Sequence, residues 1–165
     1  MDTARKSIVY LDDHQLFRQG FRKACDPHGD RFIFHEFSYP DDALAFLETS
    51  YQVGSRVDLI ISDINHPGMN GALFAAAAQE LAIRYGVQVP LMIVSMVVWQ
   101  LLTPQMIYQF REEGLIEGIE KEFQPMIEKL LLEPMLTGAI QVCLPKSSTV
   151  ELILEYMEAL SRRDD

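Results

Sequence analysis

The chain of 165 residues is long enough to bury one hydrophobic core but short for two, so we expect a single domain spanning residues 1–165. Hydrophobic residues make up 48% and charged residues 23% of the sequence, a composition that excludes a disordered or fibrous protein. Aspartate and glutamate (24) outnumber lysine and arginine (14), and the resulting net charge of −10 argues against direct binding to nucleic acid.

From the sequence we expect neither a membrane span nor a secretion signal. No apolar run approaches the roughly 18 residues that a membrane-spanning helix needs, and the N-terminal segment lacks the apolar core of a signal peptide. Cys25 and Cys143 are far apart and lack the spacing of a zinc or redox site. We therefore expect a cytoplasmic protein with reduced thiols and no membrane partner.

Apolar runs and amphipathic segments alternate in the first half of the chain. The run at 7–11 is typical of a strand, and the segment at 16–25 after it has apolar residues at helical spacing. A second run at 31–37 precedes a helix that begins near Pro40. A third at 57–62 is nearly continuous in apolar residues, as a parallel strand buried on both faces should be.

The same alternation continues to the end of the chain. A helix is predicted at 71–86, and two further strands at 89–95 and 139–144. The last helix begins near Ser148. Five strands alternating with helices predict an α/β fold, in which helices cover both faces of a doubly wound parallel sheet.

The connection between the fourth and fifth strands is unusually long. Ser95 and Lys146 are 51 positions apart (146 − 95), whereas one helix with two short loops needs only about 20 residues. We predict a helical insertion at about 99–135 with helices at about 104–122 and 125–132, the second ended by Pro134.

Apolar residues of this insertion allow two interpretations. They either extend the core of the domain or form a surface for a second copy or another protein, and the pattern alone does not decide between the two. The residues are Met106, Ile107, Phe110, Leu115, Ile116, Ile119, Phe123, Met126, Ile127, Leu130 and Leu131.

Polar residues follow four of the predicted strands. Asp12 and Asp13 end the first strand and Asp63 the third, while Ser95 and Lys146 follow the fourth and fifth. Each alone has an ordinary structural explanation, but the carboxyl ends of parallel strands meet at one edge, where ligands bind. Two carboxylates about 4 Å apart repel by roughly 4 kcal/mol at an effective dielectric constant of 20, so three of them favour a bound cation. The oxygen ligands suit Mg²⁺ together with a phosphoryl group.

These positions, with the segment "DLIISDINHPGMNG" at 58–71, resemble the receiver domain of two-component response regulators. The segments "DDHQLFRQGFRKA" and "LPKSS" are most similar to the NarL/LuxR branch of that family. The resemblance implies a CheY-like (flavodoxin-like) sheet with strand order 2-1-3-4-5. It covers nearly the whole chain except about 99–135.

The resemblance also implies roles for the residues at the sheet edge. Asp63 is the expected phosphoacceptor, and Asp13, Asp63 and the backbone carbonyl of Asn65 are the expected ligands of Mg²⁺. Asp12 would act mainly through a bound water, Ser95 would follow the phosphoryl group with its hydroxyl, and Lys146 would contact that group. Gly71 is expected to let the loop after Asp63 fold back beneath the site.

The implied function is that of a stand-alone receiver. A histidine kinase or a phosphotransfer protein would donate the phosphoryl group, and the output would pass through protein contacts, including a homodimer or a downstream protein bound by the inserted helices. Such a chain assists its own phosphorylation and dephosphorylation and is not otherwise an enzyme. The alternative is an adaptor that keeps the fold and acts without phosphorylation. An aspartate-based phosphatase is disfavoured, since those enzymes carry D-x-D on the first strand.

The chain departs from the family in several ways besides its length. Met96 follows Ser95 where receivers usually have a small residue, and its bulk is expected to obstruct the donor or slow hydrolysis. Cys143 stands where many receivers have the Tyr or Phe that turns inward on activation.

The sequence ends soon after the last helix, so the DNA-binding domain of the NarL/LuxR branch is not expected. The four histidines, His14, His28, His35 and His66, lack metal-ligand spacing and are expected to have ordinary surface or loop roles.

Overall fold

One parallel sheet of five strands organises the structure, a computed structural model that describes residues 5–66, 68–98, 100–114, 121–122 and 124–162. The strand order is β2-β1-β3-β4-β5, and all four pairings are parallel. This order and the α/β class confirm the prediction. The strands are β1 (Lys6–Leu11), β2 (Phe32–Phe37), β3 (Leu59–Ser62), β4 (Leu91–Ser95) and β5 (Val142–Pro145).

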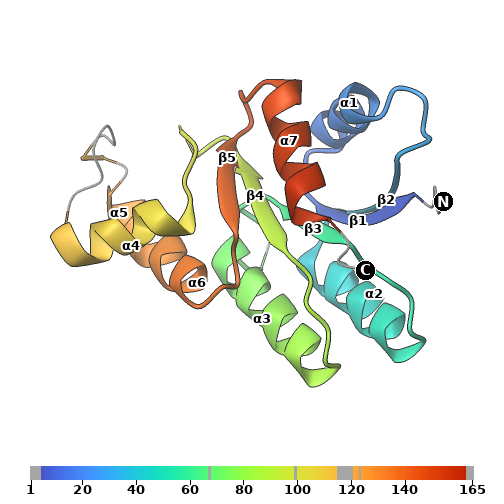
Figure 1. The fold of residues 1–165 in the computed structure, drawn as a ribbon, viewed down its shortest axis with the longest axis horizontal. Coiled ribbons are helices and arrows are strands. Elements are labelled where there is room, and N and C mark those ends of the chain that lie inside the picture. The colour runs from blue at the N-terminus through green and yellow to red at the C-terminus, as the bar shows by residue number, and fades with distance from the viewer. Residues whose placement is uncertain (1–4, 67, 99, 115–120, 123, 163–165) are drawn as a thin grey trace.

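Helices cover both faces of the sheet (Figure 1). One face carries α1 (Gln15–Cys25) and α7 (Val150–Leu160), and the other carries α2 (Pro40–Gln52) and α3 (Gly71–Arg84). Side chains on alternate positions of β1 and β3 enter two separate buried clusters, one beneath each helical layer. Because the central strands are buried on both faces, their sequences are almost wholly apolar up to their carboxyl ends.

Among the described residues between β4 and β5, the structure forms four short helical segments. They lie beside α3 at the β5 end of the sheet (Figure 1), where both η1 and α6 contact α3 and α4 packs on α6. The segments are α4 (Pro104–Glu113), α5 (Gln124–Met126), the π-helix η1 (Ile127–Leu131) and α6 (Leu132–Leu136).

Most of the described apolar residues of this connection extend the domain's own core. Ile107, Phe110, Ile127 and Leu131 are buried in the cluster that α2 and α3 also enter. Met106, Met126 and Leu130 are partly buried against it. The remaining residues that the sequence singled out, Leu115, Ile116, Ile119 and Phe123, lie outside the described part of the chain.

Two predicted helix ends in this region were wrong. The helix that begins at Pro104 ends at Glu113 rather than near 122, because Gly114 adopts a left-handed conformation (φ 72°) that terminates it. Pro134 does not end the second helical run, which continues to Leu136. Pro134 lies in the first turn of α6, directly after the π-helix η1.

The segment after β4 also covers the outer edge of β5. Leu102 and Cys143 form an isolated antiparallel bridge, in which each backbone N–H donates to the other residue's carbonyl oxygen at 2.9 Å. Cys143 is completely buried, and burial raises the pKa of its thiol. Cys143 stands where many receivers have an aromatic side chain, and in this chain that position is fully buried in the core.

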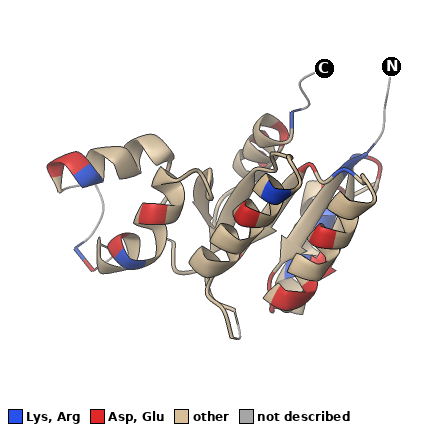
Figure 2. Cartoon of the chain, turned by 90° about the horizontal axis from the view of Figure 1, so that it is seen from below, with Lys and Arg blue, Asp and Glu red and all other residues tan. Residues whose placement is uncertain are grey.

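None of the described helices has the length and apolar character needed to cross a bilayer. On the helices, Lys and Arg residues are interspersed with Asp and Glu (Figure 2).

Candidate functional site

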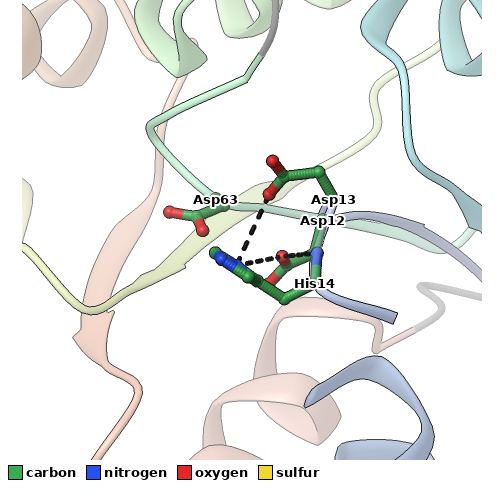
Figure 3. Close-up of side chains that lie close together, drawn as sticks. All are labelled: Asp12, Asp13, His14 and Asp63. Carbon is green, nitrogen blue, oxygen red and sulfur yellow. Dashed lines mark hydrogen bonds and ion pairs between the residues drawn. The ribbon is translucent and has the colours of Figure 1, made fainter. Parts of the chain in front are cut away.

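Three carboxylates meet at the carboxyl edge of the sheet. Asp12 and Asp13 directly follow β1, and Asp63 directly follows the neighbouring strand β3. One ligand atom from each of these residues and from His14 lies within 4.8 Å of all the others (Figure 3). Asp12 and Asp63 are buried, whereas Asp13 is exposed. Adjacent parallel strands thus assemble the acidic cluster that the sequence predicts.

Lys146 reaches the same cluster from the end of β5. Its Nζ lies 2.8 Å from Asp12 Oδ2 and 3.0 Å from Asp63 Oδ2, and 4.4 Å from the centroid of the Phe17 ring. Burial lowers the pKa of Lys146, but hydrogen bonds to Asp12 and Asp63 and the charges of these carboxylates raise it more, so that the net pKa lies above its ordinary value. The amine is therefore protonated and offsets one of the three negative charges.

The two carboxylate oxygens of Asp63 have different partners. Oδ1 accepts a hydrogen bond from the backbone N–H of Ile64 at 2.6 Å, and Oδ2 faces Lys146. The backbone N–H of Asp63 donates to the carbonyl of Leu11 at 3.0 Å, which ties the residue to the end of β1. The side chain is thus held in one orientation, with one oxygen directed toward the cation.

The loop after Asp63 folds back against its own start, as expected from Gly71. A Cβ atom at Gly71 would lie 2.6 Å from the Asp63 carbonyl oxygen and 2.7 Å from Ile64 Cα. Both neighbours are backbone atoms that cannot move without displacing the phosphoacceptor candidate. Only glycine fits at this position.

We predict that Gly71→Ala lowers the free energy of unfolding by about 1–3 kcal/mol, the usual cost of overpacking. Gly20→Ala is the control, because Gly20 lies within α1 and an added Cβ atom there would meet nothing within 4 Å, so alanine should stabilise that helix slightly. Urea unfolding of both variants measures the difference. Equal stability of the two variants would contradict the close approach at Gly71.

Ser95, Met96 and Asn65, which the sequence also connects with the site, differ in exposure. Ser95 is buried, and its hydroxyl oxygen accepts a hydrogen bond from the Val97 N–H at 3.3 Å. Its carbonyl accepts from the backbone N–H of Lys146 at 3.1 Å, which joins the ends of β4 and β5. Met96 is 73% exposed, so its side chain lies at the surface beside the site. Asn65 is exposed in the loop two residues after Asp63.

His14 and Arg18 belong to the site although the sequence did not single them out for it. The Nδ1 atom of His14 lies 3.2 Å from Asp12 Oδ1 and 3.4 Å from both Asp13 Oδ1 and Lys146 Nζ. The side chain of His14 is exposed, as expected for a surface histidine, but it lies beside the acidic pair. Arg18 is buried and donates to the carbonyl oxygen of Asp12 and to Ser38 Oγ, which braces the end of β1. The sequence feature that could have predicted both residues near the site is their position just after the acidic pair, at the start of the first helix.

Of three comparisons with known proteins, the one with solved structures supports the architecture. No protein-family model matches the sequence, and no curated protein matches it either. Solved structures do match. The signal receiver domain of the response regulator NarL from Mycobacterium tuberculosis is 20% identical, with 95% of this chain and 96% of that chain covered and a TM-score of 0.61. The chain has the receiver-domain fold.

Two further receiver-fold matches come from structures that contain Mg²⁺ and BeF3. The receiver domain of the histidine kinase CKI1 from Arabidopsis thaliana is 16% identical, covers 93% of this chain and 90% of its own, and has a TM-score of 0.61. A chain of the CheX–CheY–BeF3–Mg²⁺ complex from Borrelia burgdorferi is 12% identical, covers 96% and 90%, and has a TM-score of 0.62. At these identities the likeness shows a common fold.

The residues at the edge of this receiver fold suit a magnesium ion. Asp12, Asp13 and Asp63 bring carboxylate oxygens together, and Lys146 offsets only one of their charges, so the cluster keeps an excess of negative charge. Hard oxygen donors from one or two carboxylates, completed by waters and a phosphate, are what Mg²⁺ takes in proteins. Asp13 is the most exposed of the three carboxylates and so the most accessible ligand.

Proposed function

We propose that this chain is a phosphorylatable receiver, in which Asp63 accepts a phosphoryl group from a histidine kinase or a phosphotransfer protein. The observation that carries the proposal is the position of Asp63, whose carboxylate lies close to those of Asp12 and Asp13 and 3.0 Å from the ammonium group of Lys146. A buried carboxylate with one oxygen fixed and the other facing a cation is arranged as a nucleophile toward an anionic group.

The transfer follows from the chemistry of the two partners. An oxygen of Asp63 attacks the phosphorus of a phosphohistidine in line, the P–O bond forms, and the P–N bond breaks so that the electron pair remains on the donor imidazole. Lys146 contacts the phosphoryl oxygens, and the Ser95 hydroxyl donates to them once it leaves the Val97 N–H. Asp13, Asp63 and the carbonyl of Asn65 would hold Mg²⁺, with Asp12 acting through a water. When bound, the ion supplies positive charge beside the phosphoryl oxygens.

The output is proposed to pass through protein contacts. A phosphoryl dianion acts by biasing a two-state element rather than by performing the downstream task itself. The connection from Ser95 to β5 contains such a candidate element, because Ser95, the Leu102–Cys143 bridge and α4 follow one another along it. The alternative of a phosphorylation-independent adaptor has less support, since most of the described apolar side chains of the inserted helices are buried.

Beryllofluoride mimics the phosphoryl group on an aspartate and tests this proposal without a donor protein. We expect beryllofluoride with Mg²⁺ to raise the melting temperature of the chain, by an amount corresponding to about 2.7 kcal/mol at 100 times the dissociation constant. Asp13→Ala should move the Mg²⁺ midpoint at least about tenfold higher, because a metal ligand is lost. Differential scanning calorimetry over a Mg²⁺ titration gives both values.

The matched control is Asp30→Ala, which removes an exposed carboxylate from the loop before β2. It should leave the Mg²⁺ midpoint unchanged. A wild-type melting temperature that does not respond to beryllofluoride and Mg²⁺ together would contradict the proposed receiver chemistry and favour the adaptor.

A further inference from the structure

Two polar side chains lie directly beneath the proposed phosphoacceptor. Ser62 is the last residue of β3, and its side chain is completely buried. Its Oγ lies 2.7 Å from the carbonyl oxygen of Asp63 and 2.9 Å from Nε2 of His66. The His66 ring is half-buried and meets Phe74 edge-on, with ring centroids 6.3 Å apart. A single hydroxyl therefore contacts both the nucleophile's backbone and the loop that follows it.

The hydrogen-bond directions can be assigned from these contacts. The Nε2 atom of His66 donates when it carries a proton and accepts when it does not. Ser62 has one proton to donate, and the carbonyl oxygen of Asp63 can only accept. If Ser62 donates to that carbonyl, Nε2–H of His66 donates to Ser62 Oγ, and every contact is satisfied.

The opposite arrangement costs more. If Ser62 donated to Nε2, the ring proton would lie on Nδ1, which is buried and has no hydrogen-bond partner among the described residues. A buried donor without an acceptor carries a desolvation penalty, and the Asp63 carbonyl would also lose the Ser62 proton. The Nε2–H form of His66 is therefore favoured.

The hydrogen bonds of His66 and Ser62 are connected to the carboxylate of Asp63 through one peptide group. Its carbonyl belongs to the same rigid peptide group as the Ile64 N–H, which donates to Asp63 Oδ1 at 2.6 Å. Fixing the carbonyl end of this peptide group with Ser62 also fixes its N–H end. The N–H end holds Oδ1, and Oδ2 is left facing Lys146 at 3.0 Å.

From this geometry we infer that Ser62 and His66 are positioning residues for the phosphoryl transfer, acting as one hydrogen-bonded unit that orients the Asp63 carboxylate. The inference rests on the proposed function for its effect on rate. The hydrogen bond of Ser62 goes to the backbone carbonyl of Asp63 and that of His66 to Ser62, not to the carboxylate oxygens of Asp63. The pair should therefore control how fast Asp63 reacts rather than how tightly the donor or Mg²⁺ binds.

Nuclear magnetic resonance of the resting protein tests the geometry without any phosphorylation. We expect the ¹⁵N shifts of His66 to show a protonated Nε2. The Ile64 amide proton should be shifted downfield by its bond to Asp63, and should move in Ser62→Ala and in His66→Phe by similar amounts. His66→Gln should keep the wild-type amide shift, because the side-chain amide of glutamine can donate from nearly the same place.

Phosphoryl uptake from acetyl phosphate tests the consequence, measured well below the melting temperature of each variant. Ser62→Ala and His66→Phe should each lower the maximal rate about fivefold, the equivalent of one lost hydrogen bond. The double variant should also lose about fivefold rather than about 25-fold, because the two residues act in series. The half-saturating concentrations of acetyl phosphate and Mg²⁺ should not change, and His66→Gln should recover most of the rate.

Several outcomes would overturn the inference. An Nε2 of His66 without a proton, an Ile64 amide shift that changes in neither variant, or rate losses that multiply in the double variant would each contradict a single hydrogen-bonded unit. Lower melting temperatures with unchanged maximal rates would show that the pair only stabilises the fold. A wild-type protein that takes up no phosphoryl group would contradict the proposed function. The resonance measurements would still test whether Ser62 and His66 form the inferred hydrogen bonds.

Discussion

Asp63→Asn is expected to reduce phosphoryl uptake from acetyl phosphate and Mg²⁺ to background. The asparagine oxygen can still accept the hydrogen bond that Ile64 donates to Asp63 Oδ1, so the loop should keep its conformation. The amide lacks the anionic oxygen that attacks phosphorus, and the loss should therefore be chemical rather than structural. Quenched samples separated on Phos-tag gels give the rate.

Asp30→Asn serves as the control for this variant, because it removes one negative charge at an exposed position. It should be phosphorylated like the wild type. If Asp63→Asn still acquires one phosphoryl group, the acceptor is another residue and the assignment of Asp63 is wrong.

Lys146→Met is expected to affect both stability and reactivity. Methionine keeps an apolar stem beside Phe17 but removes the ammonium group that lies within 3.0 Å of Asp12 and Asp63. The two carboxylates then face each other without a counter-charge, and breaking such a buried pair costs about 3 kcal/mol in the absence of metal. Mg²⁺ should restore much of this stability, because an amine is not a metal ligand and the oxygen donors remain.

The rate of phosphoryl uptake by Lys146→Met should fall about a hundredfold even at saturating Mg²⁺, because one preorganised positive charge at the phosphoryl oxygens is lost. Urea unfolding in EDTA and in Mg²⁺ separates the two effects. A variant as stable as the wild type in EDTA would contradict the role of Lys146 as the counter-charge of the acidic cluster.

The sheet and most of the site could be predicted from the sequence for physical reasons. Central parallel strands are buried on both faces, so β1, β3 and β4 are apolar runs that stop at the first polar residues. Those polar residues then lie at one edge of the sheet, which is why Asp12, Asp63 and Lys146 could be expected together. The strand order followed from the resemblance to receivers.

Features that depend on tertiary contacts could not be predicted in the same way. His14 looked like one of four unrelated histidines until the fold placed its ring against Asp12 and Lys146. The Ser62–His66 contact arises because the loop turns back under β3, which no spacing rule reports. In the inserted region, the helix that was predicted to continue to about 122 ends before Gly114. Pro134 lies in α6, directly after a π-helix that the sequence did not predict.

The phosphoacceptor assignment is tested most directly by the intact mass of the wild-type protein after incubation with Mg²⁺ and acetyl phosphate. We predict a gain of one phosphoryl group that is labile in acid, is lost with hydroxylamine as an acyl phosphate should be, and requires Mg²⁺. A wild-type mass that stays unchanged with Mg²⁺ present, or a gain that survives hydroxylamine, would contradict the account of Asp63 as an aspartyl phosphoacceptor.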